Sequence, residues 1–106
     1  MPRWLPSILQ RIRRLASAGS VRFTLKSLRE LAELELGLDE MDAVAILVRL
    51  KAGDSAGRLR SDATAEWLYV FMPRFGGEKL YVKLLVRTEC IVISFHEQVD
   101  DEEEDG

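Results

Sequence analysis

Apolar residues in the first half of the chain recur at intervals of three and four positions, which is the spacing of amphipathic helices. Ser7, Thr24 and Asp39 stand at the start of three such stretches and are candidate N-caps, and Gly19 and Gly37 follow the first two. The apolar positions are Leu5, Ile8, Leu9, Ile12 and Leu15, then Leu25, Leu28, Leu31, Ala32 and Leu36, then Met41, Val44, Ala45 and Val48. The pattern predicts three helices, with a short extended segment at residues 21–23 between the first two.

The second half of the chain is rich in β-branched, aromatic and aliphatic residues. This composition predicts strands at residues 66–75, 79–86 and 90–95, whereas residues 51–62, rich in Gly, Ala, Ser and Asp, are expected to form a loop. Short turns between strands favour antiparallel neighbours. The sequence therefore predicts an α+β fold, an antiparallel sheet of about three to four strands with about three helices packed on one face.

Two tight turns define the expected register of the sheet. Gly76-Gly77 suits a two-residue hairpin because glycine accepts positive φ at both central positions, and Thr88-Glu89 is the second expected tip. The first turn pairs Phe75 with Glu78, Arg74 with Lys79, Met72 with Tyr81 and Val70 with Lys83. The second pairs Val86 with Ile91, Leu84 with Ile93, Lys83 with Ser94 and Tyr81 with His96. Tyr81 and His96 are thus predicted to be direct cross-strand neighbours.

Because side chains alternate between the faces of a strand, this register assigns each residue to a face. The face expected to meet the helices is apolar and holds Trp67, Tyr69, Phe71, Leu80, Val82, Leu84, Val86, Ile91, Ile93 and Phe95. The opposite face holds Leu68, Val70, Met72, Arg74, Lys79, Tyr81, Lys83, Leu85, Val92, Ser94 and His96. The second face gathers cations around a tyrosine and the only histidine, and it is the candidate functional surface.

Arg74, Lys79 and Lys83 are expected around Tyr81 on this surface, with His96 across the strand. Such a cluster fits phosphodiester cleavage in RNA, in which the 2′-hydroxyl loses a proton, the phosphorane needs cationic stabilisation and the 5′-oxygen gains a proton. Histidine carries protons near neutral pH, arginine holds phosphate through two hydrogen bonds, and lysine supplies charge. No metal or other cofactor is expected.

Each of these residues also has an ordinary structural explanation. His96 can be an exposed residue near the end of its strand, and Lys79 and Lys83 can be solvent-facing lysines that discourage aggregation. Tyr81 can be a packing partner of Met72 across the strand. Their convergence on one face favours the functional interpretation.

Charge is divided unevenly along the chain. The 106 residues carry a net charge of −3, but six of the 18 acidic residues lie in the segment 100–105. Without them, 15 basic residues stand against 12 acidic ones, so the preceding part of the chain has an excess of about three positive charges. We expect one domain at residues 1–97 followed by a disordered acidic tail at residues 98–106.

Cysteine usage and hydropathy limit the class of protein further. Cys90 is the only cysteine, which excludes an internal disulfide. No apolar run approaches the ~20 residues needed to span a bilayer. The expected location is the cytoplasm, without membrane association.

Several blocks of this sequence resemble MqsR-type toxins. They are Gly19-Ser20-Val21-Arg22-Phe23-Thr24, Leu36-Gly37-Leu38-Asp39-Glu40-Met41, Trp67-Leu68-Tyr69-Val70-Phe71-Met72-Pro73-Arg74, Tyr81-Val82-Lys83 and Ile91-Val92-Ile93-Ser94-Phe95. The resemblance extends from the first helix to His96, and the order and spacing of the blocks are more specific than any single block. It implies a RelE-like fold, cleavage of free messenger RNA at GC-containing sites without the ribosome, and neutralisation by a cognate antitoxin encoded nearby.

The resemblance also implies roles for individual residues. Tyr81 and Arg74 stand where the family has tyrosine and arginine, and Tyr81 matches a residue implicated in catalysis. His96 stands where the best-known member has a lysine tied to activity, so it is expected to keep a cationic or proton-carrying role.

Two positions depart from the family pattern. Leu68 replaces a glutamine and cannot donate or accept a hydrogen bond through its side chain. The family's lysine in the preceding loop aligns near Ala56, and only Arg58 or Arg60 could substitute for it from nearby. An arginine supplies charge, but its pKa is too high for it to transfer protons readily.

The sequence supports three hypotheses. In the first, the chain is a metal-independent endoribonuclease restrained by an antitoxin, with Tyr81, His96, Arg74 and Lys83 in catalysis. The residues expected to bind RNA phosphates are Arg58, Arg60 and Lys79. In the second, favoured by the two departures, it is a catalytically impaired module that binds RNA or an antitoxin. In the third, it is a structural interaction domain. The oligomeric state of the free protein is left open.

Overall fold

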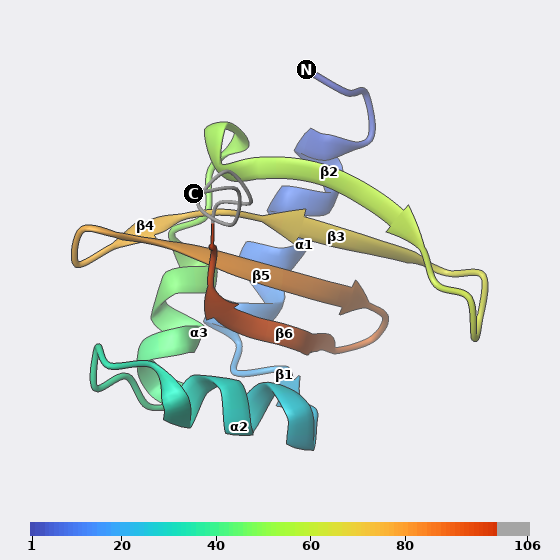
Figure 1. Ribbon diagram of the computed structural model, residues 1–106. Coiled ribbons are helices and arrows are strands. Elements are labelled where there is room, and N and C mark those ends of the chain that lie inside the picture. The colour runs from blue at the N-terminus through green and yellow to red at the C-terminus, as the bar shows by residue number, and fades with distance from the viewer. Residues whose placement is uncertain (100–106) are drawn as a thin grey trace, which may run out of the picture.

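The computed structural model describes residues 1–99 and confirms the predicted α+β class (Figure 1). The helices are α1 (Leu5–Ser17), α2 (Leu25–Glu33) and α3 (Glu40–Val48), and a short 3₁₀ turn, η1, covers Ala52–Asp54. The strands are β1 (Val21–Phe23), β2 (Ser55–Arg60), β3 (Trp67–Phe71), β4 (Arg74–Phe75), β5 (Glu78–Val86) and β6 (Cys90–Glu97). Most of the acidic tail expected at residues 98–106 lies outside the described residues, which end at residue 99.

The sheet is mixed and larger than predicted. Its strand order is β1-β6-β5-β3-β2, and β4 pairs with the first residues of β5. β1 runs parallel to β6, whereas the other pairs are antiparallel. The prediction of a loop at residues 51–62 is wrong, because most of this segment forms η1 and the edge strand β2. Its small and polar residues hide a strand that is held by pairing with β3 and interrupted by an irregularity between Ser55 and Arg58.

Two helices cover one face of the sheet, and the third lies at its edge. α1 and α3 pack against each other behind the sheet, and α2 runs along β6 and β1 (Figure 1). Fully buried residues from both layers form the core, including Ile12 and Leu47 from the helices and Phe71, Leu80 and Phe95 from the strands. Among residues 1–99, no helix crosses the opposite face of the sheet, which we call the helix-free face.

Two of the three expected helix caps are confirmed. The Thr24 hydroxyl accepts a hydrogen bond from the Ser27 backbone N–H, and Asp39 forms a reciprocal capping box with Asp42. Ser7 is not the cap of α1: Trp4 is the N-cap residue, and the Ser7 hydroxyl donates to its carbonyl.

The expected buried face of α3 is only partly correct, since Val44 and Val48 pack against the core but Met41 and Ala45 do not. Met41 is 80% exposed and Ala45 is also exposed. The helix instead buries Ala43, Ile46 and Leu47. Its sequence is apolar on several sides, so hydrophobic spacing alone does not choose a face.

The β5–β6 connection contains two departures from the predicted register that cancel. The turn has three residues, so Val86 pairs with Cys90 instead of Ile91. Ile93 is then an extra residue in β6, because Leu84 pairs with Val92 while Lys83 pairs with Ser94. This bulge restores the expected pairing of Tyr81 with His96.

The bulge also changes which β6 residues enter the core. Cys90 and Val92 belong to it, in place of the predicted Ile91 and Ile93. Ile91 pairs with Leu85 on the opposite face. Within residues 1–99, no helix has the length and apolar character needed to cross a membrane.

Candidate active site

The helix-free face of the sheet brings Tyr81 and His96 into direct contact. They are cross-strand partners on β5 and β6, and their rings stack with centroids 4.9 Å apart and planes 12° from parallel. Both side chains are half-buried, so each keeps access to solvent. The pairing predicted from the two turns is confirmed, and the stacking holds phenol and imidazole where they can act on one bound group.

Three cations flank this pair along the same face. Arg74 of β4 pairs with Lys79 of β5, two residues before Tyr81, and Lys83 lies two residues after it. Arg74 and Lys79 are exposed, whereas Lys83 is half-buried beside Ser94. None of the three makes an ion pair or side-chain hydrogen bond with residues 1–99, so their charges are available to a ligand.

The hydrogen bond of His96 indicates which ring nitrogen carries the proton. His96 Nδ1 lies 2.9 Å from the carbonyl oxygen of Glu97. A carbonyl oxygen only accepts, so this contact is a hydrogen bond when Nδ1 donates. In the neutral imidazole, Nε2 then holds the lone pair and can take a proton from a substrate.

A polar network from α2 adjoins His96 and was missed by sequence reasoning. The Lys26 ammonium bridges the Glu30 carboxylate at 2.8 Å and the Ser94 hydroxyl at 2.9 Å. The Phe95 backbone N–H donates to the other carboxylate oxygen of Glu30, at 2.9 Å. Glu30 thus satisfies the backbone of β6 beyond the last β1 pairing, at Phe23. The sequence signal was the spacing of Lys26 and Glu30, four residues apart on one helix.

The electrostatics of Glu30 reflect this position. Burial favours its neutral form, but the hydrogen bond from Lys26, the backbone N–H of Phe95 and the charges of Lys26 and His96 outweigh that effect. The net result is a pKa below the usual 4.5 of a glutamic acid. Glu30 is therefore a fixed negative charge near His96.

Arg58 and Arg60 are not brought together with Tyr81 and His96. The Arg58 guanidinium lies 3.8 Å from the centre of the Trp67 ring and 4.9 Å from that of Trp4, and the Arg60 guanidinium lies 4.1 Å from the Trp67 ring. Arg58 pairs with Tyr69, whose side chain belongs to the core face. The two arginines thus extend toward α1, on the other side of the sheet.

The two positions that depart from the family pattern lie on neighbouring strands. Leu68 of β3 is half-buried and pairs with Leu59 of β2 and Leu85 of β5, which makes an apolar row on the helix-free face. Ala56 is exposed on β2, beside the irregularity in that strand. Neither side chain offers a charge or a hydrogen bond.

Other reactive groups within residues 1–99 do not form an alternative centre. No cluster of three His, Cys, Asp or Glu side chains that could hold a metal ion occurs there. Cys90 is fully buried, and burial raises the pKa of its thiol to about 12. A thiol with that pKa is not a nucleophile at neutral pH.

Comparison with known proteins identifies relatives of this chain. The family described as "Motility quorum-sensing regulator, toxin of MqsA" matches residues 6–97. A protein of Escherichia coli (strain K12) named "mRNA interferase toxin MqsR" is 31% identical over 90 residues, which cover 85% of this chain and 91% of that protein. The matched region contains every residue of the cluster around Tyr81 and His96.

Proposed function

This chain belongs to the MqsR toxin family, and from that premise we propose that it is an endoribonuclease that cleaves messenger RNA and thereby arrests translation and growth. The observation that carries the proposal is the stacked Tyr81–His96 pair among cations that have no ion-pair partner within residues 1–99. The reaction takes place in the cytoplasm, and a cognate antitoxin encoded nearby neutralises the protein.

His96 is the proton-carrying residue of the proposed reaction. Its Nε2 removes the proton from a ribose 2′-hydroxyl, and the 2′-oxygen attacks the adjacent phosphorus. A bond forms between the 2′-oxygen and phosphorus while the bond to the 5′-oxygen breaks. The leaving 5′-oxygen takes a proton from the imidazolium or from water. The reaction needs no metal or other cofactor.

Tyr81 and the cations stabilise charge in this reaction. The Tyr81 hydroxyl donates a hydrogen bond to a phosphate oxygen, and stacking on His96 holds its ring in place. Arg74 and Lys83 lie on either side of Tyr81 and offset the negative charge of the phosphorane. Lys79 binds a neighbouring phosphate.

The test is cleavage of a defined transcript by the purified full chain in the presence of a metal chelator. Tyr81→Phe and His96→Ala are expected to lower kcat by about 10²- to 10⁴-fold, which is the usual contribution of a general acid–base group. Thr88→Ala, an exposed turn substitution, is the control and should cleave like the wild type. Undiminished cleavage by both site variants would refute the site assignment.

The second candidate function is a module that binds RNA or the antitoxin without cleaving RNA. The absence of functional side chains at Leu68 and Ala56 favours it. It predicts that RNA is retained in a salt-dependent manner and recovered intact. In that case the double change Leu68→Gln and Ala56→Lys, which restores the family's side chains, is expected to produce cleavage.

The antitoxin relationship has its own test. Expression of this chain alone is expected to stop growth, and co-expression with the product of the adjacent gene should restore it. The two products should also co-purify. Growth arrest that no neighbouring gene product relieves would count against the proposed pair.

A further inference from the structure

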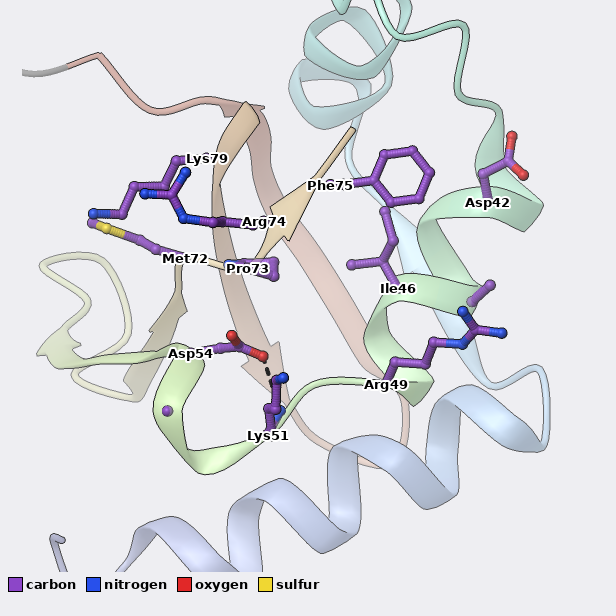
Figure 2. Close-up of a pocket in the computed structure, with 12 residues that line it drawn as sticks. Asp42, Ile46, Arg49, Lys51, Asp54, Met72, Pro73, Arg74, Phe75 and Lys79 are labelled. Carbon is purple, nitrogen blue, oxygen red and sulfur yellow. Dashed lines mark hydrogen bonds between the residues drawn. The ribbon is translucent and has the colours of Figure 1, made fainter. Parts of the chain in front are cut away.

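A cavity of about 580 Å³ adjoins the candidate active site and has no role in the reaction described above. It lies between α3, η1 and the β4–β5 hairpin (Figure 2). Its lining residues are Asp42, Ala45, Ile46, Arg49, Lys51, Gly53, Asp54, Met72, Pro73, Arg74, Phe75 and Lys79. The volume falls within the range of about 300–1,000 Å³ that is typical of small-molecule sites.

The charged lining of the cavity favours an anion. Four cations contribute to it: Arg49, Lys51, Arg74 and Lys79. Within the described residues, none of these four side chains makes an ion pair or a hydrogen bond.

The two carboxylates of the cavity are already engaged by backbone N–H groups. Asp42 accepts a hydrogen bond from the N–H of Asp39, and Asp54 accepts one from the N–H of Lys51. The carboxylates keep their charge, but the four cations of the lining outnumber these two acids, and the excess positive charge favours phosphate.

The cavity also has an apolar wall. Phe75 is 40% exposed although it is a large hydrophobic residue, and Figure 2 shows its ring facing Ile46 of α3. Pro73, which directly precedes β4, also lines the cavity, whereas Met72 extends on the same side of β4 as Arg74 and Lys79 (Figure 2). An exposed aromatic ring beside unpaired cations suits a ligand with a flat base and a phosphate.

The cavity and the candidate active site share residues. Arg74 and Lys79 line the cavity, and Figure 2 shows their side chains extending side by side on the opposite side of β4 from Phe75. Lys79 is two residues from Tyr81 on β5. Positions two apart on a strand are about 7 Å apart and lie on the same face. A nucleic acid strand held at Tyr81 and His96 can therefore continue into the cavity.

We propose that this cavity binds the nucleotide that flanks the cleaved bond in the RNA substrate. Its base stacks on Phe75, and Arg49 and Lys51 hold the phosphate on the far side from Tyr81. The proposal rests on RNA being the substrate, and it extends the site by one nucleotide toward α3.

The test is binding of a 2′-O-methyl oligoribonucleotide, which cannot be cleaved, so the result does not depend on catalysis. In the full chain, the double change Arg49→Gln and Lys51→Gln is expected to weaken binding about tenfold, the size of one lost charge-assisted hydrogen bond. The slope of log affinity against log salt should fall by about 0.7, since Arg49 and Lys51 hold one phosphate and each phosphate contact to a single strand contributes about 0.7.

The matched control is Arg3→Gln with Arg14→Gln, which removes the same charge from exposed positions of the N-terminal region. It should bind RNA within about twofold of the wild type. Equal affinities and salt slopes for the two double variants would overturn the proposal. Phe75→Leu, which keeps an apolar side chain but removes the ring, should weaken binding about fivefold or more.

Two further arms separate the proposal from its alternatives. Wild-type chain that binds the oligonucleotide but fails to cut a transcript would refute the proposed catalysis and leave the cavity assignment in place. Saturable binding of adenosine monophosphate that is lost with Arg49 and Lys51, while RNA affinity stays constant, would assign the cavity to free nucleotides and overturn the proposal.

Discussion

Both faces of the sheet carry arginine, but the arginines of the two faces are in opposite situations. On the helix-covered side, Arg58 and Arg60 stack on Trp67, and Arg58 also reaches Trp4. On the helix-free side, Arg74 is exposed beside Lys79 and has no ion-pair or hydrogen-bond partner within residues 1–99. A cation engaged by the protein contributes to stability, and a cation without an internal partner is available to a ligand.

Residue type and position in the sequence therefore do not decide which face of the sheet an arginine occupies. Arg58 and Arg60 were expected to bind phosphate because they stand near the place of a family lysine. The strand β2 turns them toward α1 instead, where their planar groups cover indole rings. Comparing the two faces therefore gives separate expectations for activity and for stability.

The largest effect is expected for charge removal on the helix-free face. Arg74→Gln should lower kcat/KM for RNA cleavage about 100-fold, since a group that stabilises transition-state charge is lost. Arg58→Gln should stay within about twofold of the wild type, because its guanidinium lies on the other face. Steady-state cleavage of one defined transcript measures both. Similar losses of kcat/KM in Arg74→Gln and Arg58→Gln would contradict the proposed difference between the two faces of the sheet.

The next effect concerns Glu30, which forms an ion pair with Lys26 beside the candidate active site. Glu30→Ala leaves the Phe95 N–H without its partner and should lower the free energy of unfolding by about 2 kcal/mol. Glu30→Gln keeps a hydrogen-bond acceptor for the Phe95 N–H, so it is expected to lower the free energy of unfolding less than Glu30→Ala does. Urea unfolding at pH 7 measures both variants.

The pH dependence of this contribution has a defined sign. The folded-state pKa of Glu30 lies below 4.5, so its contribution is fully present above about pH 4.5 and is lost as the pH falls further. The stability gap between the wild type and Glu30→Ala should therefore narrow in acid. A gap that stays constant down to pH 2 would show that the charge of Glu30 contributes nothing.

The helix-free site could be predicted largely because its register is local. The Gly76-Gly77 turn has positive φ at both glycines, and it fixes Arg74 opposite Lys79. The contact between Tyr81 and His96 was predicted correctly with a wrong turn length, since the bulge at Ile93 compensated for the extra turn residue. Such a bulge depends on packing against the core and leaves no clear signal in the sequence.

Other features depend on contacts that are distant in the sequence. β2 is a strand only because β3 lies beside it, and its composition is that of a loop. The buried face of α3 is chosen by α1, which packs against it, since the helix is apolar on several sides. The contact of Glu30 with the Phe95 N–H joins residues 65 positions apart. The local sequence pattern therefore does not predict the strand β2, the whole buried face of α3 or the contact of Glu30.

A smaller effect is expected on stability when the stacked arginines are removed. Arg58→Gln with Arg60→Gln should lower the free energy of unfolding by about 1 kcal/mol through loss of the cation–π contacts with Trp67. Arg74→Gln, which removes an unpaired and exposed side chain, should change it by less than about 0.5 kcal/mol. Unfolding followed by tryptophan fluorescence measures both. A larger loss of stability in Arg74→Gln than in the double variant would mean that the stacking of Arg58 and Arg60 on Trp67 does not stabilise the fold.

The smallest effect on stability is expected when the surface ion pair between Arg87 and Glu66 is removed. Its Nε and Nη2 atoms donate to the two carboxylate oxygens of Glu66 at 3.0 and 2.6 Å, which joins the β2–β3 connection to the β5–β6 turn. The hydrogen bond from Arg87 is the main reason why the pKa of Glu66 falls to about 2. Both side chains are substantially exposed, at 47% for Arg87 and 35% for Glu66, so solvent screens the pair.

Glu66→Gln is therefore expected to give a stability loss that is small, dependent on pH and dependent on salt. The folded-state pKa of about 2 lies below the usual 4.5 of a glutamic acid, so the contribution is complete above pH 4.5 and disappears as the pH falls through 2. Molar NaCl should reduce it at any pH. Glu35→Gln, an exposed carboxylate without a partner in the described part of the chain, is the control and should show neither dependence. If Glu66→Gln behaves like this control, the ion pair between Arg87 and Glu66 contributes nothing measurable to the free energy of unfolding. An arginine of this protein then stabilises the fold only where it also stacks on an aromatic ring.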